Sequence, residues 1–349
     1  MTVPRIVARW LAYSAAHLMI PCCVAQDIPA LPYSGTDTIV YVDDNGRQKK
    51  QNGSIEDLRG DRLVFRPNGS GPIQRIDTVR LSQLIFLRGE HWNAALQLHS
   101  KGEPASALGA ILKAIESETR PWAWAEGMAF AARLEIQLGQ RVQAVSRIEL
   151  IRARDLRTRH VGLLPLVWDE RLPEAERLQL PVIRMASDSP VIRIAAASSW
   201  LHDPQNRAGA TRALNEVAKA EGASLLGQLA RAQLWRLHLL EKPAERNSVL
   251  KIWRETILEI PPGARGGPQF VLATNLEAAH DYDRAALGYL WTPMMTPWDP
   301  ALSAHSIQRA VVCLRKAGRP AEAGLMLAEL KQRFPESSVA RTLEDELKQ

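Results

Sequence analysis

The segment Gly318-Arg319-Pro320-Ala321-Glu322-Ala323 joins two apolar helical patterns, and its form recurs at three earlier places in the chain. Each copy has a glycine-like turn residue five positions before an alanine, followed by apolar residues four and seven positions further on. Recurrence of this kind predicts an internal repeat. The four pairs of turn residue and alanine are Gly102 and Ala107, Gly139 and Ala144, His280 and Ala285, and Gly318 and Ala323.

The spacing of the copies indicates the type of repeat. Ala107 and Ala144 are 37 residues apart, and Ala285 and Ala323 are 38 apart. The pattern resembles the tetratricopeptide repeat, a helix-turn-helix unit of about 34 residues with small residues where its two helices cross. The copies are degenerate, since Val311 takes the small position of the fourth first helix and the usual aromatic residue of that helix is replaced in every copy.

The resemblance to tetratricopeptide repeats implies that a peptide or protein partner binds along the concave face formed by the first helices. It places one candidate residue in the second repeat, two in the third and three in the fourth. By register these are Arg133, Thr274, Glu277, Gln308, Arg315 and Lys316.

Between the second and third copies, residues 173–260 are expected to stay helical but lose this register. The run from Asp188 to Leu201 opens with aspartate, serine and proline and continues with paired alanines, which resembles HEAT-type helix pairs. Both resemblances imply an α-solenoid, in which neighbouring helices bury each other's apolar stripes. We therefore expect one helical-repeat domain over residues 89–349.

Residues 36–88 differ from the rest of the chain, with β-branched residues in short runs between turn residues such as Asn45-Gly46 and Asn68-Gly69. This pattern predicts a small all-β module of five strands. Closing the sheet into a barrel would remove its exposed edges. The spacing from Gly53 to Leu63 resembles SH3-like or Sm-like small barrels, so we expect a small β-barrel domain here.

The first residues are expected to direct export. Arg5 and Arg9 precede an uncharged stretch, which indicates a signal peptide over residues 1–25 and a linker over 26–35, with a retained amphipathic anchor as the alternative. Cleavage would leave Cys313 as the single cysteine, so that no intramolecular disulfide could form. We expect a periplasmic or cell-envelope protein in which Cys313 is a buried small hydrophobe.

Composition and motifs point away from catalysis. The 349 residues are 46% hydrophobic and 23% charged, as in folded soluble proteins, and contain no Walker A, HExxH or GxSxG motif. Glu277 and His280 share one helical face, but a di-iron bundle needs a second such pair. We expect no enzyme activity, no metal and no cofactor.

Residues 141–159 carry the strongest local charge, six arginines against Glu149 and Asp155. On a helical projection the exposed side would carry Arg147, Arg154 and Arg157, which is either an ordinary solvated face or a face for an anionic partner such as an envelope polymer. Nucleic acid is disfavoured because no aromatic residues are interleaved.

These observations predict a mostly α-helical fold, an α-solenoid of degenerate tetratricopeptide- or HEAT-like hairpins preceded by a small β-barrel. The predicted function is a non-catalytic exported scaffold or interaction module that binds a peptide or protein on the solenoid. The alternative is a carbohydrate- or peptidoglycan-binding protein of the cell envelope that uses the small barrel or the basic helix face.

Overall fold

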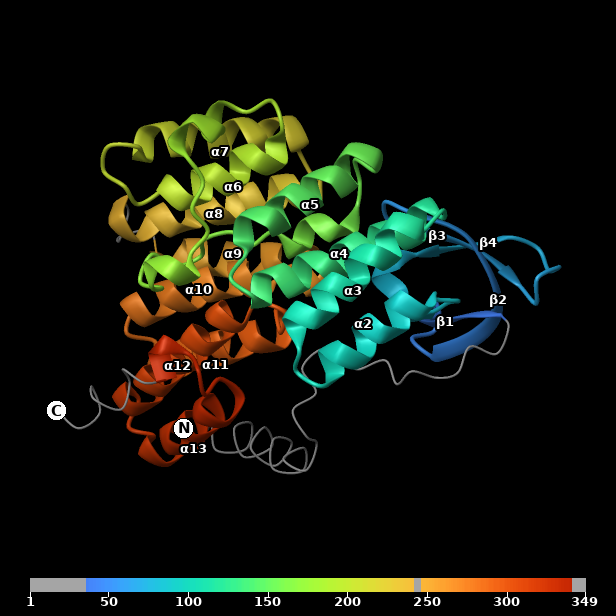
Figure 1. The fold of residues 1–349 in the computed structure, drawn as a ribbon. Helices are drawn as coiled ribbons and strands as arrows, with labels where there is room; N and C mark the ends of the chain where they lie inside the picture. The colour runs from blue at the N-terminus through green and yellow to red at the C-terminus, as the bar shows by residue number, and fades with distance from the viewer. Residues whose placement is uncertain (1–35, 242–245, 341–349) are drawn as a thin grey trace.

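The computed structural model describes residues 36–241 and 246–340; the expected signal peptide and linker lie outside them. A five-stranded antiparallel sheet comes first, and the described chain then forms a helical repeat-like region of twelve α-helices (Figure 1). None of the helices in these two ranges is long and apolar enough to cross a membrane.

All five predicted strands are present. Hairpin turns join the first strand to the second, the second to the third and the third to the fourth. These turns have positive φ at Gly46, Gly60, Asn68 and Gly69, as the turn signals predicted. The sheet order is β4-β3-β2-β1-β5. The strands are β1 Asp37–Val42, β2 Gln48–Arg59, β3 Arg62–Pro67, β4 Gln74–Asp77 and β5 Leu81–Ile85.

The expectation of a closed barrel is wrong, because β4 and β5 form the two edges of the sheet and do not pair with each other. Only the 3-10 turn Thr78–Arg80 connects them. Four residue steps span at most about 14 Å, whereas four strand spacings in a flat sheet cover about 19 Å. The sheet must therefore curl, and it buries Ile39, Leu63 and Phe65 without closing its edges.

The helices follow in paired contacts, as the repeat predicted. The hairpins are α2 with α3, α4 with α5, α10 with α11, and α12 with α13, and a further pair forms from α6 and α7. The helices are α2 Glu90–Ser100, α3 Pro104–Ser117, α4 Pro121–Gln137, α5 Arg141–Arg154, α6 Pro190–Trp200, α7 Arg207–Glu221, α8 Leu225–Glu241, α9 Arg246–Glu259, α10 Gly266–Ala278, α11 Tyr282–Met295, α12 Pro300–Lys316 and α13 Pro320–Arg333.

The four hairpins that carry the repeated motif turn in the same way. Gly102, Gly139 and Gly318 have φ between 75° and 77°, and His280 has φ 61° in the equivalent position. Each of these residues ends its helix in the left-handed backbone conformation, which glycine adopts without a Cβ clash. The alanine five residues later is 0% to 3% exposed in all four hairpins, so the close crossings predicted from the spacing are confirmed.

The middle of the chain departs from the expected helicity. Residues 155–189 contain only short 3-10 turns, and α-helix resumes at Pro190. Pro165, Pro173 and Pro181 interrupt this stretch, and each proline removes a backbone donor and restricts the residue before it. The interruption supplies an extended segment that the repeat alone would not have.

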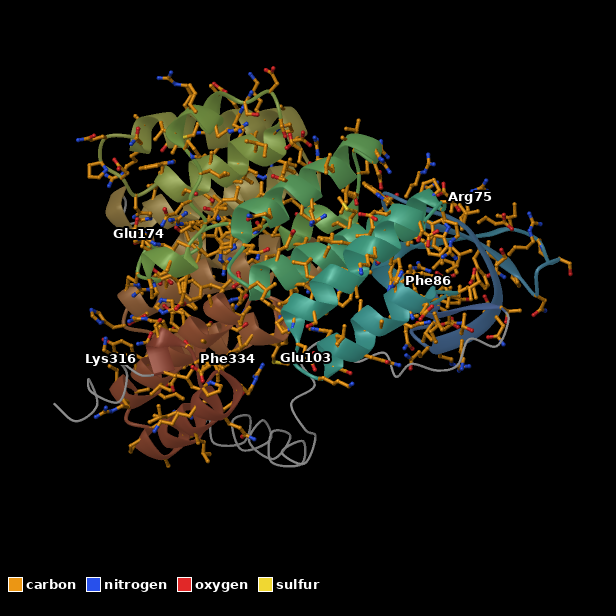
Figure 2. The ribbon with its side chains drawn as sticks, in the orientation of Figure 1. Arg75, Phe86, Glu103, Glu174, Lys316 and Phe334 are labelled. Carbon is orange, nitrogen blue, oxygen red and sulfur yellow. The ribbon has the colours of Figure 1, made fainter. Side chains whose placement is uncertain are left out.

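An aromatic cluster joins the sheet to the first helices. Phe86, just after β5, meets Trp92 and Trp122 edge-on at centroid distances of 5.3 and 4.9 Å, and it lies where the sheet meets the helices in Figure 2. On the other side of the junction, the Gly60 backbone N–H donates to Asp155 at 2.6 Å. The two regions therefore share a packed boundary.

The helical region also folds back on itself. Arg141, at the start of α5, forms a bidentate ion pair with Asp299, just before α12, at 2.7 and 2.9 Å. Both side chains are at least 94% buried. Near the end of the described chain, the Ser338 hydroxyl donates to Glu176 at 2.6 Å. An open solenoid has contacts only between neighbouring repeats, and these two contacts close the array.

Candidate functional site

An extended piece of the chain is buried between α6, α8 and α10. Residues 163–169 are all buried, although they belong to no α-helix. The Val167 N–H donates to Ser198 of α6 at 3.2 Å, and Arg236 of α8 donates to the Val167 carbonyl at 2.7 Å. Side chains of the helices thus satisfy the main chain of this segment, which a buried backbone requires.

The same segment packs closely on α10. A Cβ placed on Gly267 would lie 1.9 Å from the Trp168 ring, so only glycine allows the indole to approach. Further along, Trp200 of α6 donates its indole N–H to the Leu180 carbonyl at 2.6 Å. The segment spans several helices, much as a bound peptide would, but it belongs to the chain itself.

Asp169 anchors the polar end of this segment. Its carboxylate lies 2.9 Å from Nε2 of His305 on α12 and 2.6 Å from the Arg171 guanidinium. Burial alone would raise the pKa of Asp169, but the hydrogen bonds from His305 and Arg171 outweigh it and hold that pKa well below its usual range. The other ring nitrogen of His305 contacts Gln308 Oε1 at 3.1 Å. Both ring nitrogens of His305 thus contact side chains of the chain itself, and His305 connects α12 to the segment.

Glu277 forms a second buried carboxylate centre beside the first. Its Oε2 accepts from the Tyr289 hydroxyl at 2.9 Å, and its Oε1 accepts from Arg309. Lys316 lies 3.7 Å from the same carboxylate. Burial opposes ionisation, but the hydrogen bond and charge of Arg309 lower the pKa of Glu277. Tyr289 stays a neutral donor, because burial and the Glu277 charge raise its pKa.

Basic side chains rim these two carboxylates. Arg171 and Lys316 are 40% and 48% exposed, and Arg309 is 19% exposed, whereas the two acids are at most 9% exposed. Arg315 is also exposed, next to Lys316 at the end of α12. The surface above the two carboxylates is therefore cationic, although the buried carboxylates themselves are paired with arginines.

The structure brings together part of the predicted groove set. Thr274 Oγ1 lies 3.1 Å from the Tyr289 hydroxyl oxygen, so it joins Glu277 and Lys316 around one centre. Gln308 lies beside this centre through its contact with His305. Glu277 and Gln308 are buried, at 8% and 9% exposure. These two side chains hold the chain's own residues and present little surface to a partner.

Arg133 lies apart from that cluster, on α4 with Glu126. Glu126 accepts from Arg159 at 2.7 Å and lies 3.1 Å from His160 Nε2. Arg133 is exposed at the surface, yet the protein packed around it lowers its pKa, and Arg159 adds a like charge. Burial also lowers the pKa of His160, so that this imidazole is neutral near pH 7.

The basic stretch 141–159 is largely paired within the chain. Besides Arg141 and Arg159, Arg147 binds Glu135 at 2.7 Å and Arg152 binds Glu221 at 2.6 Å. Arg147 is 21% exposed and is bound to Glu135, so only part of its side chain reaches the predicted solvated face.

The other two arginines of the predicted basic face stay at the surface. Arg154 is exposed and lies 3.7 Å above the Trp124 ring. Arg157 is exposed too, but it follows the end of α5 at Arg154, so the helical projection does not apply to it.

The described residues include a buried thiol and a small cavity. Cys313 is buried, and burial raises its pKa to about 12, so it is held as a thiol. The described part of the chain holds no group of three or more His, Cys, Asp or Glu side chains arranged to bind a metal ion. A small cavity of about 10 Å³ between Gly162, Trp168, Gly267 and Leu302 has room for about one water.

Sequence reasoning missed the residues that organise the site, chiefly Asp169, Arg171 and Arg236. One signal was available: an apolar run from Val161 to Trp168 followed directly by Asp-Glu-Arg. Such a run, interrupted by Gly162 and Pro165, is too short and too broken for a helix, and it fits a buried extended segment with a charged end. Neither models of known protein families nor curated protein sequences match this chain.

Proposed function

We propose that the protein is an exported, non-catalytic scaffold of tetratricopeptide type that binds a peptide or protein partner through its helical region. The observation that carries the proposal is the recurrence of one hairpin geometry, with a left-handed turn residue and a buried alanine five residues later in four hairpins. Stacked hairpins offer long surfaces for partner recognition. Export rests on residues 1–25, which lie outside the described residues.

The exposed part of the predicted groove set is basic. Arg315 and Lys316 lie at the end of α12, and Lys316 shares its helical face with Arg309, seven residues earlier. Together with Arg171 these side chains form a cationic rim above the buried Glu277. An acidic segment of a partner would complement this rim, and rim charges chiefly set the rate and specificity of association.

A second candidate function uses the other basic surface. Arg154 and Arg157 are exposed, and Arg157 lies against the β2–β3 turn, where a Cβ on Gly60 would be 3.1 Å from its own Cβ. The face thus runs from the helices onto the sheet. An anionic or carbohydrate polymer of the cell envelope is the partner that fits such a continuous surface.

One binding experiment separates the two candidates. The variant Arg315→Glu with Lys316→Gln changes the rim, and Arg154→Glu with Arg157→Glu changes the other face. We expect a partner captured from envelope extract, once purified, to bind the rim variant about tenfold more weakly or worse. The second variant should bind normally, and circular dichroism should show that both are folded.

The opposite pattern would overturn the proposal. Unchanged binding by the rim variant, together with loss in the Arg154 and Arg157 variant, would assign the function to the envelope-polymer face. If both variants bound the partner as tightly as the wild type does, neither surface would be the binding site.

A further inference from the structure

A group of basic side chains lies around Glu170, the residue that follows Asp169 at the end of the buried segment. His202, just after α6, lies 3.3 Å from the Glu170 carboxylate through Nδ1, and Arg236 of α8 lies 3.6 Å from it through Nη2. Arg207 of α7 donates to the His202 carbonyl at 3.4 Å. Arg177 is near enough to oppose the charge of Arg236. Three helices and one extended segment thus converge here.

Positive charge exceeds negative charge at this point. Arg236 and His202 contact the Glu170 carboxylate, and Arg207 and Arg177 add positive charge beside them. Asp169, the other acid nearby, is bound to Arg171 and His305. Glu170 is also 42% exposed, so solvent weakens its attraction. Arg236 is only 4% exposed, and burial lowers its pKa to about 10. Arg236 Nη1 donates to the Val167 and Ser198 carbonyls and to Gln233 Oε1, but these acceptors are neutral. A nearby anion would therefore still stabilise the buried charge.

Unused hydrogen-bonding groups mark the same place. Among the described residues, Nε of Arg177, Arg207 and Arg236 and Nε2 of His202 are buried without a hydrogen-bond partner. Single unpartnered guanidinium nitrogens also occur elsewhere in the described residues, at Arg88 and Arg141, whereas here three guanidinium nitrogens and one imidazole nitrogen lie in one group. Arginine is suited to carboxylate and phosphate because its donors lie in a plane.

We propose that Arg177, His202, Arg207 and Arg236 form a binding site for an oxyanion, a carboxylate or phosphate-like group that sits beside Glu170. The site is distinct from the cationic rim at Lys316 and does not depend on the proposed partner binding there. The anion supplies the missing counter-charge to Arg236 and accepts from the unpartnered donors.

Proton uptake by His202 accompanies binding. Its Nδ1 faces the Glu170 carboxylate and carries the ring proton, so Nε2 is a bare lone pair in the neutral ring. Burial and the charges of Arg236 and Arg207 lower the pKa of His202 to about 4, against the opposing effect of Glu170 and Asp169. An anion at Nε2 reverses that balance and raises the pKa, so its affinity increases as the pH falls.

Calorimetric titration of the whole protein tests the site, with sulfate and glutarate as probes at constant ionic strength in chloride. Sulfate does not titrate between pH 6 and 7.5, so any pH dependence belongs to the protein. We expect saturable binding that is tighter at pH 6 than at pH 7.5. Preference for sulfate would indicate a phosphate-like ligand, and preference for glutarate a carboxylate.

Two variants and a matched control make the result specific. Arg207→Gln should weaken binding at least about tenfold, since a charge-assisted hydrogen bond is lost. Arg212→Gln, an exposed arginine on the same helix, should bind as the wild type does. His202→Gln should abolish the pH dependence. No saturable binding, or equal loss in the Arg207 and Arg212 variants, would overturn the proposal.

Discussion

The ion pair between Arg141 and Asp299 makes the strongest prediction, because it joins residues 158 positions apart in a buried place. Replacing Arg141 with Met keeps most of the side-chain volume but leaves the Asp299 charge without its partner. Breaking a buried pair from one side typically costs about 3 to 5 kcal/mol. We expect the free energy of unfolding of Arg141→Met to fall by that amount at pH 7.

A double-mutant cycle shows whether the cost comes from the stranded charge. Asp299 also accepts from the Leu302 N–H at 3.2 Å as the N-cap of α12, and asparagine caps equally well. Arg141→Met with Asp299→Asn removes both charges and keeps the cap. The double variant should therefore recover more than half of the stability lost in the single variant.

Urea denaturation at pH 7, followed by circular dichroism, measures these changes. As a control, Arg284→Met breaks an exposed pair with Asp281 and should cost less than about 1 kcal/mol. An Arg141→Met midpoint equal to that of the control would refute the reasoning that the helical array is closed by this contact.

Three further predictions follow from burial, backbone conformation and charge. Ala323→Arg should destabilise the protein by about 2 to 4 kcal/mol in urea denaturation, because Ala323 is only 3% exposed. Ala321→Arg, at an exposed position on the same helix, should have little effect. Similar denaturation midpoints for the two variants would contradict the helix crossing at Ala323. His280→Gly should raise the thermal midpoint, because His280 has φ 61°, a conformation that is unstrained only for glycine. Gly139→Ala should lower the midpoint for the same reason. A lower midpoint in both variants would contradict this account of the turn. The pKa of His202 is lowered to about 4, so the unfolded state binds a proton at higher pH than the folded state does. The stability of the wild type should therefore decline between pH 6.5 and 4, and His202→Gln should make this decline smaller. Parallel stability profiles for the two proteins would show that His202 does not cause the decline.

Local patterns in the sequence were sufficient for the five strands and the four repeated hairpins, but not for residues 173–189, which are not α-helical. The five strands and the four repeated hairpins depend on turn residues and on apolar periodicity, which act between residues close together in the chain. Gly102, Gly318 and His280 mark their turns because the helix end needs a left-handed residue at that point. Burial of Ala107 and Ala323 could be predicted for the same reason, since the helix after the turn must cross the one before it.

The tertiary structure decided what these elements enclose. Whether β4 pairs with β5 depends on the curl of the whole sheet, and no local pattern encodes that curl. Asp169 and His305 are in contact although they are 136 residues apart in the sequence, and no local pattern around either residue indicates the other. Periodicity shows which face of a helix is apolar but not which distant segment covers it. Among the predicted groove residues, Glu277 and Gln308 are therefore buried against the chain's own residues, whereas Arg315 and Lys316 are exposed.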